Sequence, residues 1–146
     1  MRLMLSVVDA DGAAVNDAMI EIWQADADGN HECNADPAFR RFGRLCTDEQ
    51  GFATFETIKP GATSDAAGGR QAPHINVMIF ARGLLKQLFT RVYFDGEPEN
   101  GRDRVLALVP EDRKATLLAT RRGESPETWE LEIRLSGDRE TVFFDV

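Results

Sequence analysis

The chain has 146 residues, of which 42% are hydrophobic, and a formal net charge of -8, which suits one globular domain with a single core and excludes a disordered chain. Lysines and arginines form no basic stripe, and no stretch approaches the ~18 uncharged apolar residues of a membrane span, so neither nucleic acid nor a membrane is expected as a partner. The pattern of the N-terminal residues is typical of a strand and not of a signal peptide. We therefore expect a cytoplasmic protein.

The first half of the chain is predicted to form strands separated by polar loops. Alternating apolar and polar residues indicate strands over 2–9 and 18–25, and the polar stretch 26–42 indicates a surface excursion. Residues 44–58 are typical of a hairpin, because two β-compatible runs flank a turn that ends in Gly51.

The second half continues this pattern and adds one helix. The expected elements are a loop over 59–73, strands over 74–81 and 86–94, a loop over 95–103, a helix over 110–121, and two closing strands over 128–135 and 140–146. The helix is favoured because Pro110 suits its first turn and Arg121 suits its C-terminal end. The predicted fold is therefore all-β, an antiparallel β-sandwich of about eight strands with long loops and one short helix, in a single domain over 1–146.

Five segments carry a family resemblance by their order and spacing. They are "IEIWQADADG", "TIKPG", "APHINV", "TRVYFDGEPE" and "ETVFFD". Together they resemble the intradiol ring-cleavage dioxygenases across nearly the whole chain. They are most similar to the alpha subunits of the heteromeric members of that family that cleave protocatechuate (3,4-dihydroxybenzoate).

The resemblance implies a β-sandwich and a role in an iron-dependent reaction. Such enzymes insert both atoms of O2 between the two hydroxyl-bearing carbons of the aromatic diol, which gives 3-carboxy-cis,cis-muconate. A ferric, non-haem ion in the beta subunit, held by two tyrosinates and two histidines, supports this chemistry. The implied partners are thus the beta subunit, the aromatic diol and O2, with Fe3+ in the partner subunit and no cofactor in this chain.

The four ligand positions that the resemblance implies are degenerate in this sequence. They fall near His31, near Thr63, at His74 and at Asn76. Ferric iron is a hard cation that favours anionic oxygen ligands along with imidazole, yet the only tyrosine is Tyr93, which matches a tyrosine that is not a ligand in the family. The sequence therefore predicts no metal site in this chain.

Without iron, these residues are expected to have ordinary structural roles. His74 is predicted to be a histidine at a strand start that is hydrogen-bonded to a loop carbonyl, with Asn76 on the same face as a local hydrogen-bond partner. His31 is expected to be solvated. The two cysteines, Cys33 and Cys46, lie in no CxxC motif and are predicted to be reduced thiols that do not support a zinc site.

Arg82, just after the strand at 74–81, is the remaining candidate functional residue. In the similar alpha subunits an arginine at this place lies at the boundary between the subunits, which implies that Arg82 borders the substrate pocket. A guanidinium there can bind the ring carboxylate of protocatechuate bidentately. The alternative interpretation is an arginine that ends the strand and pairs with a nearby acid.

The extent of any pocket role depends on the start of the chain. The similar alpha subunits carry an additional segment before the first strand, whereas this chain begins almost at that strand, so the segment is expected to be absent and the pocket role reduced. Two other functions stay open at this point. One is a stand-alone dioxygenase with an altered metal site, and the other is a β-sandwich binding or interaction module with a degenerate site.

Overall fold

The computed structural model describes residues 1–32 and 38–146, and these residues form a β-rich fold with little helix. The strands are β1 (Arg2–Val8), β2 (Met19–Gln24), β3 (Phe42–Cys46), β4 (Phe52–Glu56), β5 (Thr63–Ser64), β6 (Arg70–Gln71), β7 (His74–Phe80), β8 (Leu88–Phe94), β9 (Leu118–Arg121) and β10 (Thr128–Arg134). The helical segments are the 3-10 helix η1 (Pro98–Arg102), the short α-helix α1 (Arg104–Ala107) and the 3-10 helix η2 (Glu111–Leu117). Within this part of the chain, no helix is long and apolar enough to cross a membrane.

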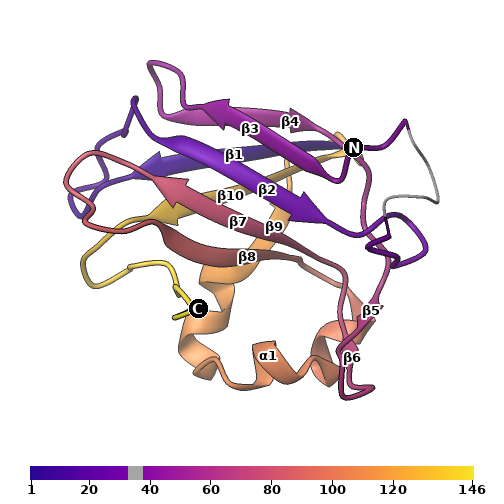
Figure 1. Cartoon of the computed structure of the whole chain (residues 1–146). Coiled ribbons are helices and arrows are strands. Elements are labelled where there is room, and N and C mark those ends of the chain that lie inside the picture. The colour runs from indigo at the N-terminus through magenta and orange to yellow at the C-terminus, as the bar shows by residue number, and fades with distance from the viewer. Residues whose placement is uncertain (33–37) are drawn as a thin grey trace.

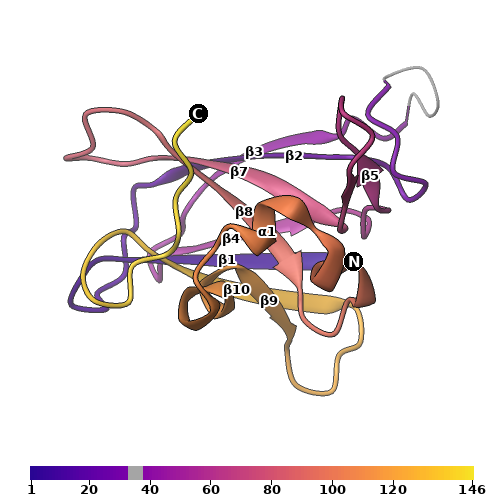
Figure 2. The ribbon, with the colours of Figure 1, turned by 90° about the horizontal axis from the view of Figure 1, so that it is seen from below.

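The strands lie in two layers that face each other (Figures 1 and 2). One layer has the order β4-β1-β10-β9 and the other the order β3-β2-β7-β8. Strand β9 joins the layers at one edge, because it pairs antiparallel with β10 and parallel with β8. The predicted β-sandwich is confirmed, although the β1–β10 and β8–β9 pairs are parallel and not antiparallel.

The core lies between the two layers and follows the alternation of the sequence. The side chains that alternate inward on the long strands are Leu3, Leu5 and Val7 on β1, Ile20 and Ile22 on β2, Ile75, Val77 and Ile79 on β7, and Trp129, Leu131 and Ile133 on β10. Each is buried, and burying a side chain of this size stabilises the fold by about 1.5–3 kcal/mol before the entropy cost of ordering the chain. The alternation also fixes which side chains point outward, including His74 and Asn76 on β7.

The hairpin predicted over 44–58 is wrong in its pairing. Both strands and the turn exist, and Gly51 adopts a φ of +82° and donates its backbone N–H to the carbonyl of Asp48 at 2.9 Å. However, β3 pairs with β2 and β4 pairs with β1, so the chain crosses from one layer to the other at this turn. A run of β-compatible residues specifies a strand but not its pairing partner. Pairing of β4 with β1 is favoured because it buries Ala53 and Phe55 between the two layers.

The helix predicted over 110–121 is also incorrect. Residues 111–117 form η2, and the chain then enters β9, where Leu118 and Ala119 pair with Tyr93 and Phe94 of β8. The local pattern favours a helix, but a strand here supplies the hydrogen bonds that join the layers. Tertiary pairing thus overrides local propensity, because the intrinsic preferences of ordinary residues for helix or strand differ by less than about 1 kcal/mol per residue.

Three further expectations need correction. The segment 140–146 is not a strand, since its pairing is limited to one bridge in which the Phe144 N–H donates to the Phe89 carbonyl at 2.8 Å. The predicted loop 59–73 contains the short hairpin β5–β6, and the predicted loop 95–103 contains η1.

Candidate functional site

The outer face of β7 and β8 brings together four of the chain's chemistry-bearing side chains. His74 lies opposite Tyr93 and Asn76 lies opposite Arg91 in the antiparallel register. The rings of His74 and Tyr93 are 5.8 Å apart between centroids. These four residues, which we call the β7–β8 cluster, occupy the place where the sequence implied two ligand positions.

His74 is buried and hydrogen-bonded as predicted. Its Nδ1 lies 2.8 Å from the carbonyl oxygen of Ala72, so the neutral ring donates its Nδ1–H to that loop carbonyl. Burial, and after it the nearby positive charge of Arg91, lowers the pKa of His74 to about 4. The imidazole is therefore neutral at physiological pH.

The lowered pKa of His74 predicts a dependence of stability on pH. The unfolded chain has the ordinary value of 6.5 and the folded chain about 4, so the folded state binds fewer protons between these values. The free energy of unfolding is thus complete above pH 6.5 and decreases as the pH falls toward 4. We expect urea titrations at about pH 7 and about pH 5 to show a smaller loss for His74→Gln than for the wild type. Equal losses in both proteins would contradict a buried neutral His74.

Arg91 of the cluster and the adjacent Asp103 both contact the Tyr93 hydroxyl. The Arg91 Nη1 donates to Gln71 Oε1 at 3.0 Å and to the Tyr93 hydroxyl at 3.3 Å. The Tyr93 hydroxyl in turn donates to Asp103 Oδ1 at 3.3 Å. Burial raises the pKa of Tyr93 to about 12, against the opposing effect of Arg91, so the phenol stays protonated.

Asp103 is the most heavily hydrogen-bonded carboxylate of this region, and the sequence reasoning missed it. It is buried, caps the N-terminus of α1, and accepts from the backbone N–H groups of Val105 and Leu106 at 2.8 Å each. Its other oxygen accepts from the Ala72 N–H at 2.8 Å, two residues before His74. A signal was present, because an aspartate just before a short apolar run is typical of a helix N-cap.

Asn76 does not have the role expected of it. Its Oδ1 is buried and accepts no hydrogen bond from the described residues, so this oxygen does not act as the local hydrogen-bond partner that was expected. This oxygen is therefore an unsatisfied group on the outer face of the sheet. An unpaired buried acceptor of this kind costs about 1–3 kcal/mol of folding free energy. Asn76 lies between Arg91 of β8 and Trp23 of β2 in the register.

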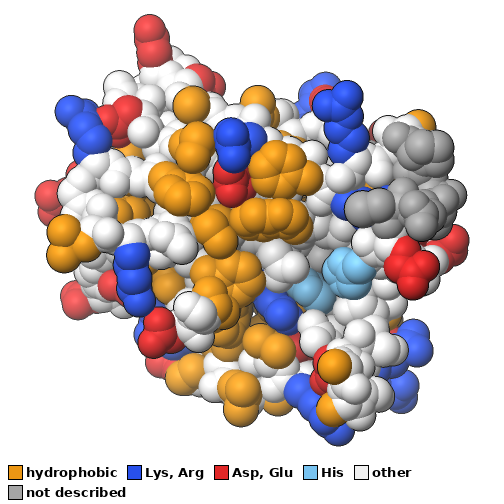
Figure 3. Space-filling model, in the orientation of Figure 1, with side chains coloured by type: hydrophobic (Ala, Val, Ile, Leu, Met, Phe, Trp, Pro, Cys, Tyr) orange, Lys and Arg blue, Asp and Glu red, His pale blue; other side chains and the backbone are white. Residues whose placement is uncertain are grey.

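The other two degenerate positions lie beside this cluster. Thr63 is buried on β5 opposite Gln71, the residue that Arg91 contacts. His31 is exposed as predicted. The two histidines appear as adjoining pale blue patches in Figure 3. Cys46 is an exposed free thiol, while Cys33 lies outside the described residues.

Arg82 lies away from the β7–β8 cluster. It follows the opposite end of β7 from His74, and eight residues of extended chain span about 26 Å. Its side chain is 87% exposed and forms an ion pair with the carboxylate of Asp17. The structure therefore does not bring Arg82 and the degenerate ligand positions into one pocket of this chain.

The donor set of the β7–β8 cluster does not fit ferric iron. It offers one buried imidazole and one neutral amide, and its phenol is hydrogen-bonded to Asp103. The Arg91 guanidinium places a fixed positive charge beside them, which disfavours a second cation. Over residues 1–32 and 38–146, no three His, Cys, Asp or Glu side chains lie close enough to hold a metal ion.

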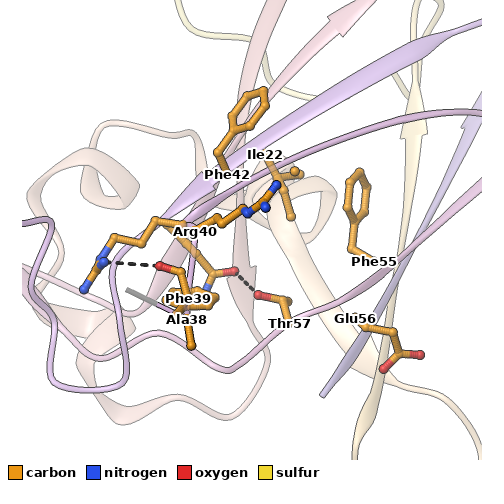
Figure 4. A pocket seen from close by; sticks show the side chains of 11 residues that line it. Ile22, Ala38, Phe39, Arg40, Phe42, Phe55, Glu56 and Thr57 are labelled. Carbon is orange, nitrogen blue, oxygen red and sulfur yellow. Dashed lines mark hydrogen bonds between the residues drawn. The ribbon is translucent and has the colours of Figure 1, made fainter. Parts of the chain in front are cut away.

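A separate cavity of about 240 Å³ lies where β3 and β4 leave the sandwich open (Figure 4). Ile22, Phe42 and Phe55 form its apolar wall, and the Arg40 guanidinium reaches across toward them. At its base the Thr57 hydroxyl donates to Gln24 Oε1 at 2.7 Å. This cavity contains none of the residues that the sequence singled out.

Comparison with known proteins identifies dioxygenases as relatives of this chain. The family model described as "Dioxygenase" matches residues 1–137. The protocatechuate 3,4-dioxygenase alpha chain of Pseudomonas putida is 43% identical over 149 residues, which cover 98% of this chain and 74% of that protein. The protocatechuate 3,4-dioxygenase beta chain of Burkholderia cepacia is 32% identical over 122 residues, which cover 77% of this chain and 52% of that protein.

The fold has relatives among solved structures as well. The dioxygenase domain of a dioxygenase carbohydrate-binding protein fusion from Streptomyces sp. SirexAA-E superposes with a TM-score of 0.73 and 26% identity, covering 93% of this chain and 79% of that one. The layers described above are thus shared with the dioxygenase domain of that fusion protein.

Proposed function

The chain belongs to the intradiol ring-cleavage dioxygenase family, and from this premise we propose that it is the alpha subunit of a two-chain enzyme that cleaves protocatechuate. The observation that carries the proposal is its greater identity to an alpha chain, 43%, than to a beta chain, 32%. In this proposal the partner beta chain binds the aromatic diol and O2, and the reaction yields 3-carboxy-cis,cis-muconate. A cytoplasmic location goes with this role.

The β7–β8 cluster supports placing the iron in the partner. Iron of this family supplies the means to activate the diol toward O2, and it needs anionic oxygen ligands. At the corresponding positions this chain has Thr63 and Asn76, which are neutral, and the Arg91 guanidinium lies opposite Asn76 and acts on His74 with its positive charge. The chain's own residues therefore do no redox chemistry, and their contribution is to assembly and to the border of the substrate pocket.

Arg82 is the residue of this chain that we assign to that border. An exposed ion pair such as Arg82–Asp17 contributes about 0–1 kcal/mol, so the guanidinium can leave Asp17 at little cost. A substrate carboxylate offers it a bidentate charge-assisted contact in a more desolvated place. Arg82 would thus position the ring without contacting the reacting carbons.

The test is to purify the chain alone and co-expressed with a beta chain of the same organism. We expect a colourless chain with no stoichiometric iron when it is alone, and an active, iron-containing complex when the beta chain is present. Full activity and the same assembly size for the beta chain alone would refute a supporting alpha subunit. A stable chain that binds iron alone would favour a stand-alone dioxygenase, and one that ignores the beta chain would favour an independent binding module.

In the same complex, Arg82→Ala is expected to raise KM for protocatechuate by about tenfold, the equivalent of one charge-assisted hydrogen bond. KM for catechols that lack the carboxylate should stay within about twofold. Arg2→Ala is the matched control, since Arg2 is another exposed, ion-paired arginine, and it lies on β1. Asp17→Ala, which frees Arg82, should leave KM unchanged. Equal effects of Arg82→Ala on both substrates would show that the arginine is structural.

A further inference from the structure

The cavity between β3 and β4 exists because the sandwich stays open at these two strands. They stand at the two ends of the strand order, and no pairing joins them in the described part of the chain. Gly43 occupies the inward position on β3, opposite the buried Ile22, and has no side chain to fill the space. A Cβ added to Gly43 would lie 3.1 Å from the Phe55 ring, so this ring packs directly on the β3 backbone. The cavity is therefore bounded by residues that the core holds in place.

One wall of the cavity is apolar and partly aromatic. Ile22 and Phe55 are buried, whereas Phe42 is 44% exposed and contacts Trp23 with 5.7 Å between the ring centroids. In Figure 4 the Ile22 side chain lies between those of Phe42 and Phe55. Aromatic side chains favour a flat apolar partner in offset or edge-to-face contact. The volume of about 240 Å³ lies below the ~300–1,000 Å³ of pockets for drug-sized ligands, so it suits a ligand with a single ring.

The cavity also contains a positive charge that no carboxylate neutralises. Arg40 is exposed, and no acid among the described residues forms an ion pair with it. Arg41, the other lining arginine, is buried and paired with Asp26 at 3.0 Å, while the lining carboxylate of Glu56 is paired with Arg2 at 2.8 Å. The Arg40 guanidinium is thus left free, although the chain has 25 acidic residues against 17 basic ones. Guanidinium groups bind carboxylates through charge-assisted hydrogen bonds, often two at once.

The polar groups at the base of the cavity are already satisfied. The Thr57 hydroxyl donates to Gln24 Oε1 at 2.7 Å, and the Gln24 side-chain amide donates to the Ile58 carbonyl oxygen at 2.8 Å. No buried side-chain nitrogen or oxygen of the described lining residues lacks a hydrogen-bond partner. The choice of ligand therefore depends on the apolar wall and on Arg40.

We propose that this cavity is a binding site for a small aromatic monocarboxylate. The ring lies against Ile22, Phe42 and Phe55, and the carboxylate accepts hydrogen bonds from the Arg40 guanidinium. The site is distinct from the β7–β8 cluster, because the two share no residue. It does not rest on the proposed function, since every group that it uses belongs to this chain.

The test titrates the isotope-labelled full chain with benzoate and follows the backbone amide signals by NMR. We expect saturable shifts at Gly43 and Thr57, which line the cavity, with a dissociation constant of about 1 mM or lower, as suits a ligand of about nine non-hydrogen atoms. Benzamide has the same ring without the charge, and benzylamine has the opposite charge. Both should bind at least about fivefold more weakly than benzoate.

Two pairs of matched variants assign the contacts. Arg40→Gln should weaken benzoate binding at least about fivefold, whereas Arg102→Gln should change it less than about twofold, since Arg102 is also exposed but lies in η1. Phe42→Ala should weaken it about fivefold, and Leu45→Ala less than about twofold, because Leu45 is 39% exposed on the same strand but does not line the cavity. All four side chains are exposed, and unchanged circular dichroism spectra would show that the variants fold.

Several results would overturn this site. They are an absence of shifts at about 10 mM benzoate, shifts confined to the β7–β8 cluster, equal affinities for benzamide and benzoate, and equal affinities of Arg40→Gln and Arg102→Gln for benzoate. A dimer of the chain that Phe42→Ala dissociates and benzoate leaves intact would show that a second copy fills the cavity instead. Failure of the chain to bind a beta chain would refute the proposed function and leave the benzoate result unaffected.

Discussion

Replacing Asp103 with alanine is expected to lower the free energy of unfolding by about 4 kcal/mol. The carboxylate accepts three backbone N–H groups at 2.8 Å each, from Ala72, Val105 and Leu106, and also the Tyr93 hydroxyl. Alanine leaves these donors unpaired in a buried place, and each costs about 1–3 kcal/mol, reduced where water enters. Urea unfolding followed by circular dichroism measures the change.

Two further substitutions test whether the lost carboxylate hydrogen bonds cause the destabilisation expected for Asp103→Ala. Asp103→Asn keeps an acceptor oxygen but removes the charge, so it should cost about half as much as alanine. Asp112→Ala is the matched control, since Asp112 is exposed in the first turn of η2, and it should change the unfolding free energy by less than about 0.5 kcal/mol. A small effect of Asp103→Ala would mean that the 98–107 segment is not anchored through this carboxylate.

The second large effect is expected at Gly29, where the chain approaches itself too closely for a side chain. Gly29 has a φ of +84°, and a Cβ placed there would lie 2.0 Å from the carbonyl oxygen of Ala62. Gly29→Ala therefore combines the left-handed strain of about 1–2 kcal/mol with a backbone clash that forces the two loops apart. We expect a loss of more than about 3 kcal/mol, measured as a lowered thermal midpoint or a loss of folded protein.

Two other glycines separate the strain from the clash. Gly68 has a φ of +76° with open space around it, so Gly68→Ala should cost only about 1 kcal/mol. Gly61 has no positive φ, but its added Cβ would lie 2.4 Å from the Ala27 carbonyl oxygen, so Gly61→Ala should approach the effect at Gly29. Equal small effects at all three sites would contradict close packing of these loops.

Gly29 and Gly61 also show how the recognised motifs relate to the fold. Gly29 ends "IEIWQADADG" and Gly61 ends "TIKPG", and the Gly61 N–H donates to the Asp26 carbonyl at 2.8 Å. The segments that carry the family resemblance are thus in direct contact, although some 30 residues separate them. The sequence could identify both motifs, but nothing in their spacing revealed that they pack together.

The degenerate ligand positions were accessible to sequence reasoning in part. The resemblance implied a ferric donor set with two phenolates, and the chain's single tyrosine excluded that set. Strand alternation placed His74 and Asn76 on one face. That Arg91 joins this cluster and that Asp103 contacts it could not be predicted from the sequence, because Arg91 lies on β8 and Asp103 lies just before α1.

The sequence by itself determined the all-β class, the family, most of the long strands and the inward-facing residues, because these depend on side-chain chemistry and on a period of two along the chain. The tertiary structure alone decided that β3 and β4 belong to different layers and that residues 118–121 form a strand joining those layers. The physical reason is that pairing partners and close approaches are long-range properties. A residue's local propensity amounts to about 1 kcal/mol or less, and the burial and hydrogen bonding of the assembled layers outweigh it.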